Sequence, residues 1–594
     1  MDKYREDILD RGIGYAKKVY FCILLKKNMK QEEESELDRN IKFNATLLLT
    51  IGLVLASFYE GMPRIISTYG YMIFFPLLVS GIMSFITSVC FAELVTLNPN
   101  SGGSYRYVYY TMGELMGFLV GWSCICTSVM QVCEKTIMMT QNIDLSLFDG
   151  RMSNFTSKYL SIGGFENYFL RILPNAELEN IILILAVIGV SILGVRKGIF
   201  VVYIIALFNI LIICSCITIF WFYMDLSKFN ILGATEDFTF FTEGSVEGHL
   251  FYMNFEVAIF GGAETVKPTT TIPRGLVEGF HIGFMFYMVS VILYSARKGA
   301  AEKNTTEPDM KNALWNLGFK TFSVLPPIGL VLCYFLSAIA EIFEATRVMY
   351  TMANDGLMFP IFGKAHRRFP NHFNSHIFLA VVCCLVGVFI GVAPSTKWAI
   401  IAMETSIRIM VLIAYLVLRY QCDSEDLSLE EYALKKRWVL TNFPHALNKP
   451  TKTTHTISML LIFLSVISII LSELIMIFFI IGTNNTLIFL RIGFVICILT
   501  AFISVQLLNQ QPVNSRKYFL YKVRGIPFTP MLAITWYSLI LMFLPPYIWV
   551  KIFCWYLLGL LFYFSYACLR SVEYRKHEAV GEVESPSEVS LPSA

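Results

Sequence analysis

Three charged residues stand inside stretches that are otherwise apolar. Glu256 follows the run FYMNF, and Glu404 and Arg408 lie four residues apart in one apolar segment. An ionised group in such surroundings is costly unless it meets a partner or faces a cavity, so it indicates either a functional or a paired group. Both readings stay open for Glu256. Glu404 and Arg408 share one helical face, and we expect a mutually neutralising pair, with a cavity-lining role as the alternative.

Other charges lie where apolar stretches begin and end. Glu93 closes one stretch and Glu114 opens the next, and we expect both to anchor loops structurally. Glu344 precedes Arg347 by three residues, so these two side chains can pair on one helix.

Several function classes are excluded. Walker A, H-E-x-x-H and G-x-S-x-G patterns are absent from the sequence, so we expect no enzyme, no metal and no cofactor. The net charge is +3 without a basic stripe, so nucleic acid is not an expected partner. The 14 cysteines fall almost entirely in apolar stretches, which indicates buried thiols rather than a disulfide framework.

The composition indicates a multi-pass membrane protein. Of the 594 residues 56% are hydrophobic and 15% are charged, whereas soluble domains carry about 25% charged residues. A helical span needs about 20 mostly apolar residues. On this criterion we expect fourteen transmembrane helices, beginning near residues 44, 71, 105, 180, 199, 247, 277, 316, 375, 398, 457, 486, 528 and 547. The lipid bilayer is therefore the expected surroundings.

The spans divide the chain into five parts. We expect a cytosolic segment over 1–43, a ten-helix core over 44–418, a cytosolic loop over 419–456, four further helices over 457–568 and a disordered cytosolic tail over 569–594. The distribution of Lys and Arg favours cytosolic termini. The sequons at Asn154, Asn304 and Asn484 then fall outside as glycosylation candidates, and the sequon at Asn44 falls inside.

Two spans are expected to be broken. The first carries Gly52, Gly61 and Pro63, and the sixth carries Gly261 and Gly262 after FYMNFE. Discontinuous helices at matching positions of two halves mark the binding site in many transporters, although Gly and Pro are also common in ordinary membrane helices.

Several stretches resemble one transporter family. NPNSGGSYRYVYYTMGELMGFLVGW, residues 98–122, resembles amino acid permeases, while RVMYTMANDGLMF (347–359), IAYLVLRYQ (413–421) and VRGIPFTPMLAITWYSLILMF (523–543) resemble the cationic amino acid transporters of the solute carrier 7 type. The resemblance covers nearly the whole chain. It identifies the chain as a divergent member of the amino acid–polyamine–organocation superfamily.

The resemblance implies an all-α membrane fold with two inverted five-helix repeats (a LeuT-like core) and four extra C-terminal helices. It also implies facilitative, sodium-independent transport of arginine, lysine or ornithine by alternating access, in the plasma membrane. The related light chains use a cysteine after span three to bind a heavy chain. Residues 136–179 contain no cysteine, so a disulfide-linked heavy chain is not expected.

The resemblance also places the substrate on the broken spans. Span one would offer backbone N–H groups to the carboxylate, and span six would hold the α-amino group. The expected binding residues are Gly52, Ala56, Ser57, Phe58, Asn254, Phe255 and Glu256. Ala56, Phe58 and Asn254 stand where the family usually has glycine, and Phe58 is expected to fill part of the site.

Further departures from the family pattern leave two functions open. Gln131, Glu134 and Lys135 replace small or weakly polar residues of span three, and Arg408 replaces a glycine of span ten. The first hypothesis is a transporter of cationic amino acids. The second is a transport-inactive relative that serves as a membrane receptor or scaffold.

Overall fold

The structure is a computed structural model that describes residues 18–27, 39–148, 150–151, 178–225, 238–297, 309–364, 372–389, 394–421, 450, 452–481, 487–513 and 522–579. In these residues the fold is helical, and the β-type pairing is confined to two isolated bridges, Ile41 with Thr265 and Met224 with Arg297. Nine of the described helices are long and apolar enough to cross a membrane, and four shorter helices are also apolar. The expected all-α membrane class is confirmed.

The elements follow one another in the order expected for successive spans. The first half of the chain contains α2 (Phe43–Val54), α3 (Gly61–Tyr69), η2 (Gly70–Ile73), α4 (Phe74–Leu97), α5 (Gly103–Met112), α6 (Glu114–Leu147), α8 (Leu178–Ile192), α9 (Val195–Phe222), α10 (Phe238–Leu250), η4 (Phe255–Glu264) and α11 (Pro268–Ser295). The second half contains α12 (Met310–Asn316), η5 (Phe322–Val324), α13 (Leu325–Asn354), η6 (Pro360–Gly363), α14 (Phe373–Phe389), α15 (Pro394–Arg419), α18 (Lys452–Ile481), α19 (Leu487–Asn509), α20 (Phe528–Met542), α21 (Pro546–Phe562), η8 (Tyr563–Ala567), α22 (Cys568–Arg570) and α23 (Val572–Ala579).

Two spans begin later than the apolar pattern predicted. The third was expected near residue 105, but α6 begins at Glu114 and α5 is a separate helix. Gly113 between them has φ +103°, a backbone conformation that ends a helix and that glycine adopts without steric cost. The eighth was expected near residue 316, whereas α12 stands apart and α13 begins at Leu325 with two prolines in its first turn.

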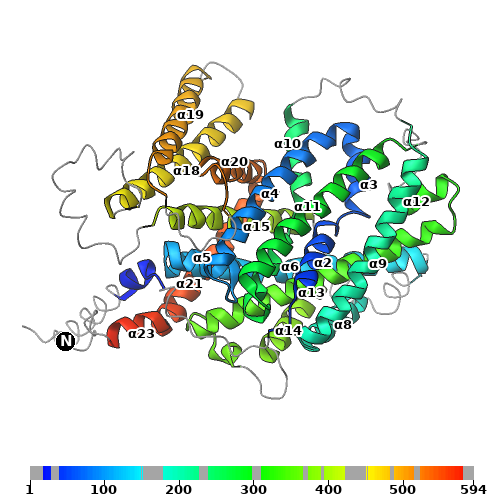
Figure 1. The fold of residues 1–594 in the computed structure, drawn as a ribbon, viewed down its shortest axis with the longest axis horizontal. Coiled ribbons are helices and arrows are strands. Elements are labelled where there is room, and N and C mark those ends of the chain that lie inside the picture. The colour runs from blue at the N-terminus through cyan, green and yellow to red at the C-terminus, as the bar shows by residue number, and fades with distance from the viewer. Residues whose placement is uncertain are drawn as a thin grey trace, which may run out of the picture.

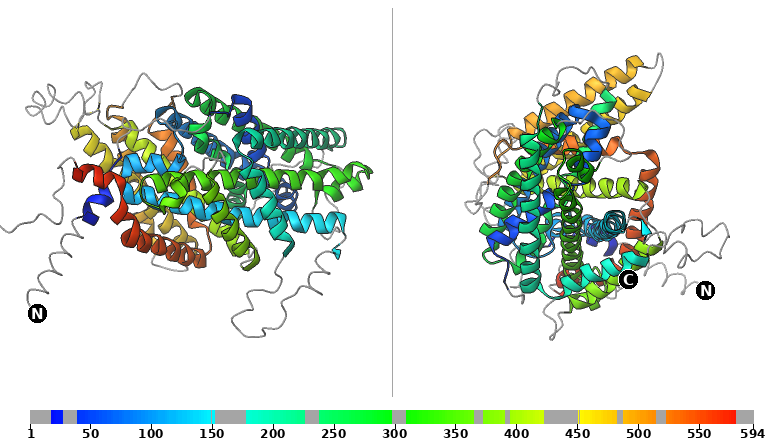
Figure 2. Two further views of the ribbon diagram at one scale, coloured as in Figure 1. Left: turned by 90° about the horizontal axis from the view of Figure 1, so that it is seen from below. Right: turned by 90° about the vertical axis from the view of Figure 1, so that its right-hand side faces the viewer.

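The core is built around α6 and α13, which lie against each other. Figure 2 (left) shows them as long cyan and green helices along the horizontal axis. Helix α11 packs on α2 and α4, and α15 packs on α5, α6 and α20. Helices α18 and α19 form a pair at the upper left of Figure 1, and α18 joins the core through α20 and α15.

The first and last described segments, residues 18–27 and helix α23, gather at one end of the bundle, which we call the terminal face. Residues 18–24 form a helix whose Phe21 ring lies 5.9 Å from the Tyr574 ring of α23. Lys27 Nζ lies 2.8 Å from Asp355 Oδ1, just after α13. Helix α23 lies inside the stretch expected to be a disordered tail, so that expectation is wrong for its 8 residues. We call the opposite end, where α3 ends and α13 and α15 begin, the far face.

Candidate functional site

Both expected helix breaks are present. Helix α2 ends at Val54 and α3 begins at Gly61, so residues 55–60 leave the helical path. Helix α10 ends at Leu250 and η4 begins at Phe255. Each break brings the N-terminus of a following helical segment, with its positive dipole end, into the middle of the bundle.

Asn254 forms the turn in the second break. Its φ is +66°, in the left-handed region that Asn tolerates better than most residues other than glycine. Its side-chain Nδ2 donates a hydrogen bond to Gln131 Oε1 on α6. Asn254, at a position where the family usually has glycine, thus keeps the left-handed backbone conformation and adds a hydrogen bond to span three.

A polar cavity of about 110 Å³ lies beside the two breaks, toward the far face. Its walls come from the first break and α3, the second half of α6, the end of α10, the first half of α13 and the start of α15. The polar and charged residues that line it are Ser57, Glu60, Arg64, Gln131, Glu134, Lys135, Asn254, Tyr334, Ser337 and Lys397. Such a concave, polar site between discontinuous helices is suited to a small zwitterion.

Three of the expected binding residues line this cavity: Ala56, Ser57 and Asn254. Gly52 does not. A Cβ at Gly52 would come within 2.6 Å of Leu336 Cδ2, so this glycine permits close packing of α2 on α13.

Phe58 also lies outside the cavity lining, contrary to the expectation that its ring fills part of the site. The side chain is fully buried, and its ring packs edge-on against the Tyr59 ring at 5.1 Å. The chain turns at residues 55–60, so successive side chains point in different directions. Alignment of this stretch with the family's glycine-rich segment therefore does not show where the Phe58 side chain points.

Glu256 pairs with Arg408 rather than facing the cavity. Arg408 Nε lies 2.8 Å from Glu256 Oε1, and Nη2 lies 3.0 Å from Oε2 and 2.9 Å from the carbonyl oxygen of Tyr252. Phe255 directs its ring to Phe280, with centroids 4.9 Å apart, so it lies in the core. The expected pairing of Arg408 with Glu404 is wrong, because the guanidinium is bound across the bundle by the carboxylate of the broken span six.

Gln131 links the remaining central groups. Its Nε2 donates to Glu404 Oε1 at 3.1 Å, and its Oε1 accepts from Lys135 Nζ at 2.9 Å as well as from Asn254. Lys135 Nζ also lies 3.1 Å from Glu341 Oε1. Two of the unexpected polar residues of span three, Gln131 and Lys135, therefore contact spans six, eight and ten.

A second set of charges lies at the far-face side of the cavity. Glu247 on α10 accepts from Arg64 Nη2 at 3.4 Å and from Lys397 Nζ at 3.2 Å. Glu60 accepts from the Tyr334 hydroxyl at 2.8 Å. Sequence reasoning missed these residues. The available signal was that Glu60 and Arg64 flank the Gly61 and Pro63 that mark the first break.

Glu93 and Glu114 hold elements together near the terminal face. Glu93 accepts from the Tyr415 hydroxyl at 2.8 Å and from the Val523 amide at 2.9 Å, and it pairs with Arg419 Nε at 3.0 Å. Glu114 accepts from the hydroxyls of Tyr109 and Tyr563, at 2.9 and 3.0 Å. These contacts fit the anchoring role expected for both.

The terminal-face side of the second break is closed by a buried ion pair. Arg347 Nη2 lies 2.9 Å from Glu264 Oε1, and Nε lies 3.2 Å from Oε2. The expected pairing of Arg347 with Glu344 on its own helix is therefore wrong. A bidentate pair with a neighbouring element fixes both oxygens of the carboxylate, which a residue on the same helix does not achieve here.

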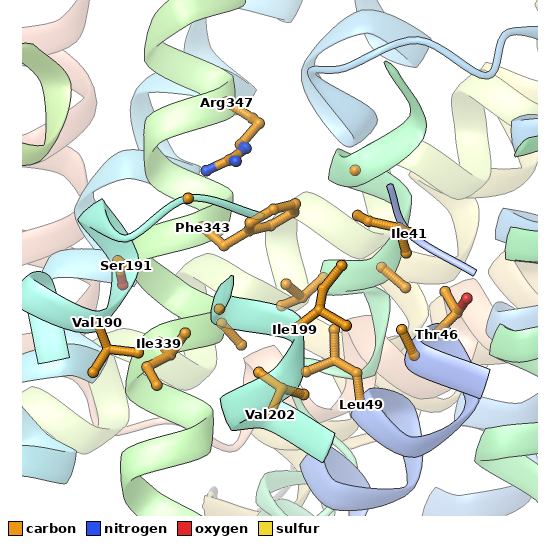
Figure 3. A pocket seen from close by; sticks show the side chains of 17 residues that line it. Ile41, Thr46, Leu49, Val190, Ser191, Ile199, Val202, Ile339, Phe343 and Arg347 are labelled. Carbon is orange, nitrogen blue, oxygen red and sulfur yellow. The ribbon is translucent and has the colours of Figure 1, made fainter. Parts of the chain in front are cut away.

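A separate apolar cavity of about 90 Å³ lies between α2, α8, α9, η4 and α13. Figure 3 shows that Leu49, Ile199, Val202 and Phe343 project into it and that Arg347 lies at one end. The Arg347 guanidinium is already bonded to Glu264 and to the Thr346 hydroxyl. We therefore place the candidate site in the polar cavity. The sequons at Asn154, Asn304 and Asn484 lie outside the described residues.

Comparison with known proteins gives the family. The family model for amino acid permeases matches residues 45–436, a range that holds both breaks and the whole lining of the polar cavity. The chain is 20% identical to cationic amino acid transporter 4 of Mus musculus over 94% of this chain and 92% of that protein. It is 22% identical to the methylthioribose transporter of Bacillus subtilis (64% of this chain, 82% of that protein) and to the branched-chain amino acid permease BcaP of the same organism (65% and 82%). Because the family model covers most of the chain, this protein belongs to the amino acid permease family of multi-pass membrane transport proteins.

Proposed function

We propose that this protein carries amino acids with cationic side chains across a membrane, by facilitated and sodium-independent transport. The observation that carries the proposal is the polar cavity at the meeting point of two helix breaks. The positive ends of α3 and η4 face this region and suit a carboxylate, and Ser57 and Asn254 offer polar side chains from the two breaks.

The cationic substrate class is supported by the resemblance to cationic amino acid transporters, which extends over 94% of the chain. Other relatives are named for branched-chain amino acids and for methylthioribose, so the substrate class is a proposal of its own. A cation needs no coupling ion to accumulate. Moving one charge through 100 mV is worth about 2.3 kcal/mol, or roughly a fifty-fold concentration ratio.

Alternating access between two inverted repeats is the proposed mechanism. The cavity lies toward the far face, while the ion pair of Arg347 with Glu264 closes the terminal-face side. We assign the far face to the outside and both chain ends to the cytosol, in the plasma membrane. During transport the terminal-face ion pair would open after the charges around Glu247 close over the substrate.

A transport-inactive receptor or scaffold is the second candidate. The observation that favours it is the buried pair of Glu256 with Arg408, because this pair ties the broken span six to α15. Alternating access requires such elements to move relative to each other, and a buried bidentate pair resists that movement.

Uptake measurements separate the two candidates. Labelled arginine, leucine and putrescine are offered to cells that express the protein, and its surface delivery is measured in parallel. The proposal predicts saturable arginine uptake that competes with lysine and persists without sodium. Absence of uptake for all three substrates, with the protein confirmed at the surface, would reject transport and leave the scaffold.

A further inference from the structure

One carboxylate in the polar cavity, that of Glu134, forms no direct ion pair with a described residue. Five residues with charged side chains line the cavity: Glu60, Arg64, Glu134, Lys135 and Lys397. Arg64 and Lys397 pair with Glu247, and Glu60 lies 3.9 Å from Arg64. Lys135 pairs with Glu341 at 3.1 Å. Among the described residues, Glu134 forms no ion pair within 4 Å and accepts no hydrogen bond.

The other central carboxylates are already engaged. Glu256 is held by Arg408, Glu341 by Lys135, and Glu404 accepts a hydrogen bond from Gln131. None of these three lines the cavity. Glu134 therefore differs from them in two ways, since its side chain reaches the cavity and its carboxylate makes no direct contact with a charged or hydrogen-bonding partner in the described part of the chain, although Lys135 and Lys397 act on its charge at longer range.

An ionised carboxylate within a membrane-spanning helix is expensive unless a cation balances it. Glu134 lies on α6 and lines the same cavity as Ser57 and Asn254, which belong to the two breaks. We expect a substrate that places its carboxylate and α-amino group at the breaks to extend its side chain along the α6 wall of this cavity. A cationic side chain at that position supplies the direct ion pair that Glu134 lacks.

We propose that Glu134 is the residue that selects for a cationic side chain, by forming an ion pair with the guanidinium or ammonium group of a basic amino acid. This inference rests on the proposed transport function and adds to it the residue that sets the charge preference. A desolvated, bidentate pair between a guanidinium and a carboxylate discriminates strongly against a neutral side chain of the same shape.

The first experiment compares arginine with citrulline, which has nearly the same shape but a neutral side chain. Ligand binding to the purified full-length protein is measured as the ligand-dependent rise in Tm, which follows ligand concentration and Kd. Wild type should bind arginine at least about tenfold more tightly than citrulline, because truncating one partner of a buried charge pair usually costs at least that much. Equal affinity of wild type for the two ligands would overturn the inference without any substitution.

The second experiment uses three variants. Glu134→Gln should lose the preference for arginine over citrulline while its citrulline affinity stays within about threefold of wild type. Glu134→Asp keeps the charge and should retain the preference. Glu473→Gln is the matched control, because Glu473 is a buried carboxylate on α18 that lies outside the cavity and accepts from Ser538 at 2.8 Å. This control should bind both ligands as wild type does.

The outcomes separate the inference from the proposed function. If Glu134→Gln still prefers arginine, or loses arginine and citrulline equally, Glu134 does not select for charge and the inference fails while transport stands. If wild type binds and transports neither arginine nor any neutral amino acid, the proposed function itself fails. If Glu134→Gln does not yield folded protein, the affinities of wild type and Glu134→Asp for arginine and citrulline test the inference. Equal affinity of either protein for the two ligands would overturn it.

Discussion

At the scale of single residues, several departures from the family pattern explain one another. Arg408 stands at a usual glycine and binds Glu256, and Asn254 stands at another and bonds to Gln131. Sequence alone identified these residues as unusual. It could not identify the partners, because each contact joins helices that are more than 120 residues apart in the chain. Spacing rules favoured the nearest partner on the same helix, and that choice was wrong for Arg408 and for Arg347.

The Glu256–Arg408 pair gives a stability prediction. Either Glu256→Gln or Arg408→Leu leaves one buried charge unpaired and should cost about 3–5 kcal/mol. The double variant of Glu256→Gln with Arg408→Leu should lose much less stability than the two single variants lose together, because both charges are removed. Thermal unfolding of the purified variants measures this. Glu404→Gln combined with Arg408→Leu is the comparison pair, and it should show no such recovery.

The left-handed turn at Asn254 gives a second prediction. Asn254→Gly and Asn254→Ala both lose the bond to Gln131, but only alanine is strained at a φ of +66°. The alanine variant should therefore be less stable than the glycine variant by about 1 kcal/mol. Equal Tm values for the two variants would show that the backbone at this position relaxes without cost.

Phe58 gives a third prediction, which reverses the sequence-based expectation. The ring is fully buried and lies outside the cavity lining. Phe58→Ala should cost about 3–5 kcal/mol of stability through loss of core packing. Arginine affinity of the folded fraction should change little. An increase in arginine affinity of tenfold or more would instead place the ring in the binding site.

At the scale of elements, apolar length and Gly or Pro positions predicted most of the helices. Both broken spans were predicted, but span six breaks at residues 251–254, ahead of the Gly261 and Gly262 that indicated the break. The separation of α5 from α6 was not predicted, because a single Gly113 lies within a continuous apolar pattern. The docking of α23 against residues 18–24 was also not predicted. Neither segment carries a local signal for a partner so distant in sequence.

Asp355 joins these segments and gives a prediction at this scale. It pairs with Lys27 at 2.8 Å and accepts from the Tyr105 hydroxyl at 2.7 Å, while its carbonyl accepts from the Val572 amide at 3.0 Å. Asp355→Asn should lower stability by about 1–3 kcal/mol, measured as a fall in Tm. Glu278→Gln is the control. It removes an exposed pair with Arg274 and should change Tm little.

At the scale of the whole molecule, composition and span count were sufficient to predict a membrane protein, and the resemblance of several stretches to known transporters indicated the family. The position of the polar cavity was only partly predictable. Ala56, Ser57 and Asn254 were anticipated on its wall, whereas Tyr334, Ser337 and Lys397 come from spans that carry no break. Which side chains of unbroken helices face a cavity depends on how the helices are rotated. Apolar spans that are buried on most sides do not reveal that rotation.

The orientation in the membrane gives a further prediction. With both termini in the cytosol, Asn154, Asn304 and Asn484 are available for glycosylation and Asn44, in the first turn of α2, is not. Removing the sequons one at a time should change the glycosidase-sensitive mobility only for the first three. A glycan on Asn44 would contradict the proposed orientation.

The most direct test of transport is arginine accumulation by purified protein in proteoliposomes under a potassium diffusion potential. With the interior negative by 100 mV and without sodium, labelled arginine should accumulate toward about a fifty-fold ratio. Accumulation should vanish when the potential is collapsed, and citrulline should not accumulate with the potential. The contradicting result is an arginine flux no higher than that of empty liposomes at any potential, measured on protein that is folded and correctly inserted. That result would reject the assignment as a transporter of cationic amino acids.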